Sequence, residues 1–105
     1  MSTVTRRQKL EAMLEASPND QMLRYMLAME LDKESAHVRS LELFQSLMKD
    51  MPPYVPAFLM AGQLLVRLER VEEARATYRT GIAEAQSQRN DHAAGEMNGF
   101  LQELE

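Results

Sequence analysis

One stretch decides the fold of this chain: residues 54–85, which read YVPAFLMAGQLLVRLERVEEARATYRTGIAEA. It can be laid without a gap over residues 20–51 at a constant offset of 34 residues, so that Tyr78 falls on Phe44. Similarity at a fixed period of this size is typical of stacked supersecondary units, because one unit alone cannot bury its apolar face. The sequence therefore predicts two copies of one structural unit.

Each unit reads as two amphipathic helices joined by a short polar segment. Apolar residues recur at spacings of three and four, which places them on one stripe of an α-helix. A glycine inside a helix costs about 1 kcal/mol relative to alanine, so we expect two helices to approach closely at Gly62. The residues that we expect to pack between helices in the two units are Leu27, Ala28, Leu31, Ser40, Phe44, Phe58, Ala61, Gly62, Leu65, Ala74, Tyr78 and Gly81.

The period and the order of large and small residues resemble the tetratricopeptide repeat. The second unit follows that pattern closely. The first unit departs from it at Arg24, where the family usually has an aromatic residue, and at Leu47, where it has a small one. Both joints between helices lack the customary glycine and have Ser35 and Glu69 instead. The resemblance implies an all-α fold in which antiparallel helix hairpins stack as a short right-handed superhelix.

The whole chain, residues 1–105, is predicted to form a single domain of about six helices. Residues 6–16 form an N-terminal capping helix, and residues 90–104 form a C-terminal one. Between them lie the first repeat, residues 20–53, and the second, residues 54–88. Helices at the two ends would cover the flanks that stacked repeats otherwise expose.

Residues with short polar side chains mark where several helices begin. Ser17, Pro18 and Asp20 predict the start of the second helix, with serine at the N-cap and proline at the first helical position. Ser35 is expected to cap the third helix, and Asn90 the last one.

Composition argues against several classes of function. The formal net charge of −4 disfavours nucleic acid and anionic membrane surfaces as partners, because both attract basic proteins. The chain has no cysteine, which removes disulfides and thiolate chemistry. The longest nearly apolar stretch, residues 55–66, is too short to span a bilayer, and residues 1–10 contain no apolar run typical of a secretory signal. We therefore expect a soluble, cytoplasmic protein.

One pair of residues suggests metal chemistry. His92 and Glu96 lie four residues apart and would share a helix face, which is the minimum geometry for two metal ligands. The same spacing also describes an ordinary exposed pair worth about 0.3 kcal/mol, and we favour this interpretation over metal-dependent hydrolysis. The chain shows neither a glycine-rich phosphate loop nor a nucleophile with a base beside it. We expect no enzymatic activity, no metal and no cofactor.

The better functional candidate is the surface formed by the first helices of the two units. In the family that this chain resembles, these helices line a concave groove that binds peptides. The corresponding residues here are Met22, Tyr25, Met29, Asp32 and Lys33 from the first unit and Pro56, Leu59, Gln63, Val66 and Arg67 from the second. Methionine is flexible and polarizable, so such a wall can adapt to an apolar partner segment. The alternative for Met22 and Met29 is that they pack on neighbouring helices.

Two hypotheses about the partner follow from this surface. The first is an adaptor whose groove binds a peptide or an amphipathic helix of another protein. The second is a homodimer that buries the same apolar wall or the last helix, since stable arrays usually contain about three units and this chain has two. Because of the negative net charge, we expect neither nucleic acid nor a membrane as a partner.

Overall fold

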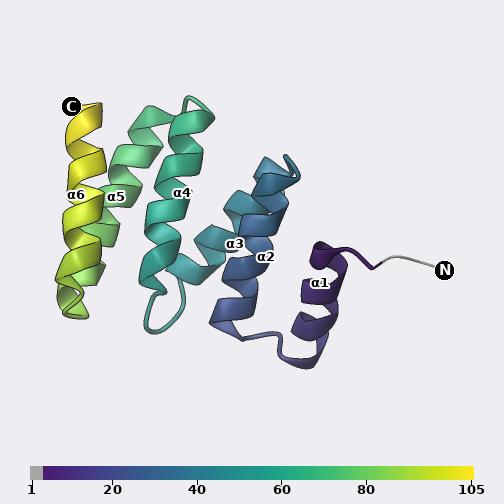
Figure 1. The fold of residues 1–105 in the computed structure, drawn as a ribbon. Coiled ribbons are helices and arrows are strands. Elements are labelled where there is room, and N and C mark those ends of the chain that lie inside the picture. Colours follow the sequence, from purple (N-terminus) through teal and green to yellow (C-terminus); the bar gives the residue numbers. More distant parts are fainter. Residues whose placement is uncertain (1–3) are drawn as a thin grey trace.

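The computed structural model describes residues 4–105 and folds them into helices that alternate in direction along the chain (Figure 1). The elements are α1 (Arg6–Ala16), α2 (Gln21–Lys33), α3 (His37–Met48), α4 (Val55–Arg67), α5 (Val71–Ser87) and α6 (Asp91–Leu104). This part of the chain contains no strand. The expected all-α fold with six helices is confirmed.

Each helix packs chiefly against its neighbours in the sequence, and α4 also contacts α6. In Figure 1, α2, α4 and α6 run in the same direction and form one face of the molecule, with α3 and α5 behind them. Stacking in one direction gives an elongated outline of 51 × 28 × 19 Å. The face formed by α2, α4 and α6, called the front face below, is therefore built from segments far apart in the sequence.

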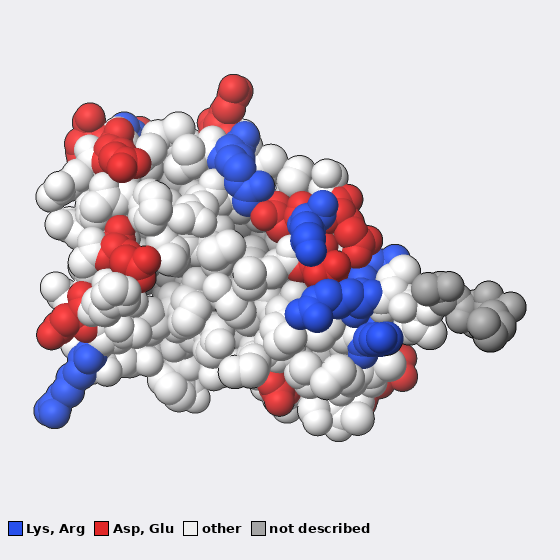
Figure 2. Space-filling model, in the orientation of Figure 1, with Lys and Arg blue, Asp and Glu red and all other residues white. Residues whose placement is uncertain are grey.

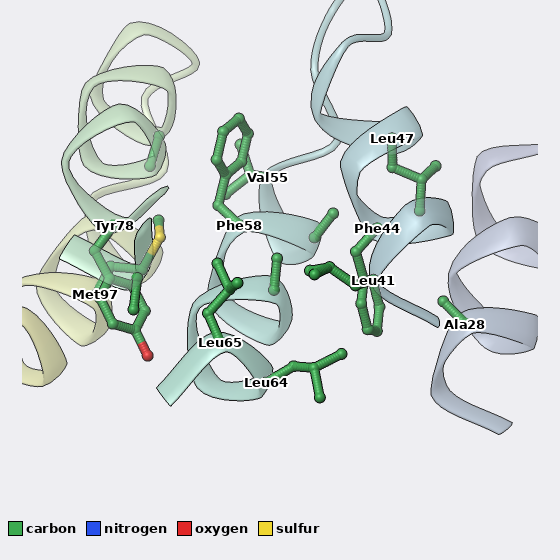
Figure 3. Packing of buried hydrophobic residues seen from close by; sticks show 14 of the residues in the cluster. Ala28, Leu41, Phe44, Leu47, Val55, Phe58, Leu64, Leu65, Tyr78 and Met97 are labelled. Atoms are coloured by element: carbon green, nitrogen blue, oxygen red, sulfur yellow. The ribbon is translucent and has the colours of Figure 1, made fainter. Parts of the chain in front are cut away.

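The main hydrophobic core is centred on α4. Phe44 on α3 and Tyr78 on α5 approach α4 from opposite sides (Figure 3), and each ring is only 1% exposed. These two residues coincide when the chain is shifted by one repeat, so the period correctly predicts two equivalent buried rings. A smaller group of buried residues lies between α1 and α2 and consists of Leu10, Leu27 and Leu31.

Every residue expected to pack between helices is buried, including the one polar member of that set. Ser40 on α3 lies at the position that Ala74 occupies in the next unit. Its hydroxyl donates a hydrogen bond of 2.6 Å to the carbonyl oxygen of Ala28 on α2. A buried polar group is tolerated when it is hydrogen-bonded in this way, so serine replaces the small apolar residue and also ties α3 to α2.

Close approach of helices explains two of the four glycines. A methyl group at Gly62 would overlap the ring of Tyr78, and one at Gly81 would overlap Phe58 and Met97. On α6, by contrast, a methyl group at Gly95 or Gly99 would have no other atom within 4 Å. The cost in helix propensity at Gly62 is therefore offset by the large aromatic ring that packs directly on its backbone.

Three helices end in the same way. Ser35, Glu69 and Arg89 follow α2, α4 and α5, and their φ angles are 64°, 61° and 61°. The next N–H bonds back into the preceding helix; the N–H of Ala36, for example, donates to the carbonyl oxygen of Leu31 at 2.8 Å. This is the hydrogen-bond pattern of a Schellman motif, in which the left-handed residue is usually glycine. Ser35 and Glu69, which stand where the family usually has glycine, thus adopt the left-handed conformation that glycine favours, and Arg89 adopts it as well.

Two of the predicted helix starts are wrong. Asp20, and not Ser17, caps α2, and its carboxylate accepts a hydrogen bond from the N–H of Leu23 at 2.9 Å. A carboxylate both satisfies a free amide and adds negative charge at the positive end of the helix. Ser35 makes no cap bond to α3, because it forms the left-handed end of α2 instead. Asn90 caps α6 as predicted.

Substitution of two glycines by alanine should change stability in opposite directions. We expect Gly62→Ala to lower the free energy of unfolding by about 1 to 3 kcal/mol, because the added methyl group overpacks the contact with Tyr78. Gly95→Ala should raise it by up to about 1 kcal/mol, because the methyl group meets open space and alanine favours the helix. Urea unfolding followed by circular dichroism measures both. Equal shifts would show that the contact between α4 and α5 is misplaced.

Glycine at the left-handed joints should stabilise the protein. A residue with a Cβ atom loses about 1 to 2 kcal/mol in this conformation, so Ser35→Gly and Glu69→Gly are each expected to raise the melting temperature. Ala76→Gly is the control, since this exposed position within α5 should lose about 1 kcal/mol. A lower melting temperature for both joint variants would contradict the left-handed assignment.

Candidate functional site

The front face carries a broad uncharged area. Figure 2, in the orientation of Figure 1, shows this area over α4, with charged side chains gathered along its edges. Two large apolar side chains on α2 are open to solvent: Met22 is 62% exposed and Met29 is 41% exposed. They are therefore available for contact and are not packed away on neighbouring helices.

The predicted groove residues lie on α2 and α4 at different depths. Those with exposed side chains are Met22, Met29, Lys33, Pro56 and Arg67, and those that are partly buried are Tyr25, Asp32, Leu59, Gln63 and Val66.

Tyr25 belongs to the core as much as to the surface. Its ring centre lies 5.9 Å from that of Phe44 and 5.3 Å from that of Tyr54. Burial, together with the nearby hydroxyl of Tyr54, raises the pKa of Tyr25 above its usual value. Because aromatic contacts of this kind stabilise the packing of α2 on α3, Tyr25 supports the front face from beneath.

A charged cluster joins the two units at one edge of the front face. Asp32, at the end of α2, is only 15% exposed at its side chain. Its Oδ2 accepts a hydrogen bond of 2.6 Å from Nη2 of Arg67 at the end of α4, and its Oδ1 lies 2.9 Å from Nδ1 of His37. Burial alone would raise the pKa of Asp32, but these partners outweigh it and lower that pKa below its usual value. Asp32 and Arg67 therefore hold the units together.

Arg24 also has a partner that the sequence did not suggest. Its Nη1 donates to Oδ1 of Asp50 at 3.2 Å, and Nε2 of Gln21 donates to Oδ2 of the same carboxylate at 2.9 Å. The hydrogen bond from Arg24 lowers the pKa of Asp50 below its usual value. Where the family usually has an aromatic residue, this chain thus uses an ion pair to connect α2 with the segment after α3.

The structure adds α6 to the candidate site. A hollow of about 370 Å³ lies between α4, α5 and α6 and brings three predicted groove residues together with four others. Within it, the rings of Tyr78 and Phe100 are stacked, with centres 6.1 Å apart and planes inclined by 15°. The lining residues are Gln63, Val66, Arg67, Tyr78, Phe100, Glu103 and Leu104. The last helix was expected to close the array or to be buried in a homodimer, so its contribution to the groove was missed, although Phe100 and Leu104 share a helix face.

His92 and Glu96 form an exposed pair on α6. Nε2 of His92 lies 3.4 Å from Oε1 of Glu96, and the histidine side chain is 89% exposed. Within residues 4–105, no cluster of three or more histidine, cysteine, aspartate or glutamate side chains is arranged to hold a metal ion. In the same range, every helix is too short or too polar to cross a membrane.

The fold and this surface define a class: proteins built of stacked helix hairpins, which serve in general as protein-interaction modules. Two solved structures identify the family. The solution structure of a tetratricopeptide repeat domain protein from Salinibacter ruber shares 33% identity with this chain, with a TM-score of 0.79, and the match covers 84% of this chain and 89% of that one. A crystal structure of a tetratricopeptide repeat domain protein from the same organism shares 31% identity, with a TM-score of 0.75, over 82% and 96% of the two chains.

This chain therefore belongs to the tetratricopeptide repeat family, as the period predicts. A solution structure of a protein from Bordetella parapertussis shows the same fold, with a TM-score of 0.81 at 24% identity over 97% of this chain and 89% of that one. No family model matches the sequence, and no curated protein does.

The tie between Asp32 and Arg67 should contribute to stability in a pH-dependent way. A carboxyl group whose pKa is lowered on folding stabilises the protein above its unfolded pKa, here 3.8, and loses this contribution as the pH falls through the folded value. We therefore expect the difference in unfolding free energy between wild type and Asp32→Asn to shrink as the pH falls below about 4.

Asp32→Asn in an Arg67→Ala background provides the control. In that background the carboxylate of Asp32 has already lost its arginine partner, so its replacement does not remove the ion pair. Urea unfolding at a series of pH values gives the four free energies of this cycle. If the effect of Asp32→Asn on the unfolding free energy has the same pH dependence in both backgrounds, the ion pair between Asp32 and Arg67 does not stabilise the fold.

Proposed function

We propose that this protein is a non-enzymatic adaptor that binds a peptide or helix of a partner protein on its front face. The observations that support this most directly are the uncharged area of that face and the exposed side chains of Met22 and Met29 on α2. Apolar surface with a polar rim is typical of sites where proteins bind one another. The flexible side chain of methionine suits such a site because it adapts to the shape of the partner.

In this proposal, residues 20–53 and 54–88 are the two repeats, and α1 covers the first of them. The helix α6 has two roles, because it closes the array and also forms one wall of the hollow beside α4. The front face then offers three parallel helices to a partner. The groove residues on α2 and α4 supply its centre, and α6 supplies one edge.

The ion pair between Asp32 and Arg67 makes these two side chains less available for contact with a charged partner. Both side chains already have a partner of opposite charge, and breaking a partly buried pair leaves a charge without compensation. We therefore assign the recognition of a partner mainly to apolar contacts. Full burial of one methionine side chain contributes about 1.5 to 3 kcal/mol, so two of them are sufficient to decide whether a segment binds.

Replacement of the exposed methionines tests this function. We expect the double variant Met22→Glu and Met29→Glu to retain less than about a tenth of the partner protein captured from a lysate, since a loss of 1.4 kcal/mol is tenfold in affinity. Val38→Glu is the matched control, because Val38 is 70% exposed on α3, behind the front face. Quantitative mass spectrometry measures the capture. Equal loss in both proteins would overturn the assignment of the front face.

Light scattering of the purified protein separates the adaptor from a homodimer that buries the same face. A monomer has a mass of 12.0 kDa, and the adaptor requires this mass at micromolar concentration. A mass twice as large that returns to the monomer value in the methionine variant would replace the adaptor by the dimer. Tyr25→Ala is less suitable for these tests, because its ring also packs on Phe44.

A further inference from the structure

We infer that the partner segment carries a bulky apolar side chain beside a lysine or arginine, and that the hollow between α4 and α6 receives both. This inference rests on the proposed function and adds to it the chemistry of the partner. It depends on the apolar walls of the hollow, on one carboxylate at its rim, and on the distribution of charge along the chain.

The walls of the hollow are suited to an apolar side chain. Val66 on α4 faces Phe100 and Leu104 on α6, and all three side chains are partly buried and so keep some contact with water. A volume of about 370 Å³ lies within the range of pockets that hold small ligands, which are lined mainly by apolar groups. An apolar side chain that enters would remove both its own surface and these three from water, which is favourable.

The two charges at the rim are not equivalent. The guanidinium of Arg67 is already neutralised by Asp32. Glu103 on α6, in contrast, has no lysine, arginine or histidine nitrogen within 4.0 Å in the described part of the chain. Burial, together with the negative charge of Glu103, raises the pKa of Tyr78 to about 12. An uncompensated carboxylate therefore stands beside the apolar hollow.

The distribution of charge along the chain favours the same partner. Residues 89–105 contain four carboxylate side chains and one arginine, and so carry three of the four net negative charges. In Figure 2, acidic side chains border the uncharged area on the side of α6. A basic segment would be attracted to this edge, while an acidic one would be repelled.

Three synthetic peptides, acetylated and amidated at their ends, test the inference. SAFKKAS has the apolar anchor and the basic residues, SAFEEAS has the anchor with acidic residues, and SASKKAS has the basic residues without the anchor. Each is titrated into the ¹⁵N-labelled full chain to about 1 mM, which detects binding free energies near −4 kcal/mol. We expect SAFKKAS to shift the amide signals of Val66 and Phe100 and to bind about tenfold more tightly than either of the other two.

Two charge-reversal variants locate the effect. Glu103→Lys should reverse the preference between SAFKKAS and SAFEEAS. Glu42→Lys makes the same change of charge at an exposed position on α3 and should leave the preference for SAFKKAS unchanged. Circular dichroism of both variants establishes that they fold. Added salt should weaken the binding of SAFKKAS to wild type, because it screens charges at the surface.

The inference is overturned if SAFKKAS leaves the signals of α4 and α6 unshifted, if SAFEEAS binds equally well, or if Glu103→Lys keeps the original preference. Its failure is distinguishable from failure of the adaptor function. If the methionine variant loses its natural partner and Glu103→Lys does not, the front face binds proteins but the hollow does not select basic segments. If neither variant loses the partner, the adaptor function itself fails.

Discussion

The Tyr78 ring packs on the bare backbone of Gly62, and the arrangement of α4, α5 and α6 follows from this contact. A Cβ atom at Gly62 would overlap the ring of Tyr78, so that either this ring or its helix would have to move. The same ring stacks on that of Phe100, with ring centres 6.1 Å apart, and so connects α5 with α6. One glycine thus sets the distance between the helices of the second unit and, through Tyr78, the place of the last helix and the hollow beside it.

The two units are held in register by different forces on different sides. Within the core, α4 is covered on both sides by apolar side chains from α3 and α5 (Figure 3). At the edge of the front face, the pair formed by Asp32 and Arg67 connects the ends of α2 and α4. Apolar burial supplies most of the stability in such an arrangement, because it scales with the area removed from water. The ion pair adds directional contacts that fix how far apart the two ends lie.

The same architecture explains why the front face is exposed. Helices α3 and α5 lie behind α2, α4 and α6, so within residues 4–105 no further layer of helices covers the front face. Its centre is uncharged, while α6 contributes acidic side chains to one border. An exposed apolar face of this kind is typical of surfaces at which proteins contact one another.

The helices, their pairing and the equivalence of Phe44 and Tyr78 could be predicted from the sequence. These features follow from local periodicity and from the repeat, which are properties of residues close together or at a fixed offset. The left-handed joints at Ser35 and Glu69 were not predicted, since Ser35 was expected to cap the third helix, although both residues stand where the family usually has glycine. Their conformation is a consequence of how a helix ends, so it is maintained even without the glycine.

The contacts between surface residues could not be predicted from the sequence and are known from the packing of the helices. The contact between Asp32 and Arg67 joins residues 35 apart, and the hollow joins Gln63 to residues on α6. Neither follows from periodicity, because helix patterns specify which face a residue occupies but not which side chain lies opposite to it. Tyr25 illustrates the difference: its position predicted a groove residue, while the neighbouring rings of Phe44 and Tyr54 made it half core. The choice between core and surface rests on packing distances between helices, which long-range contacts set.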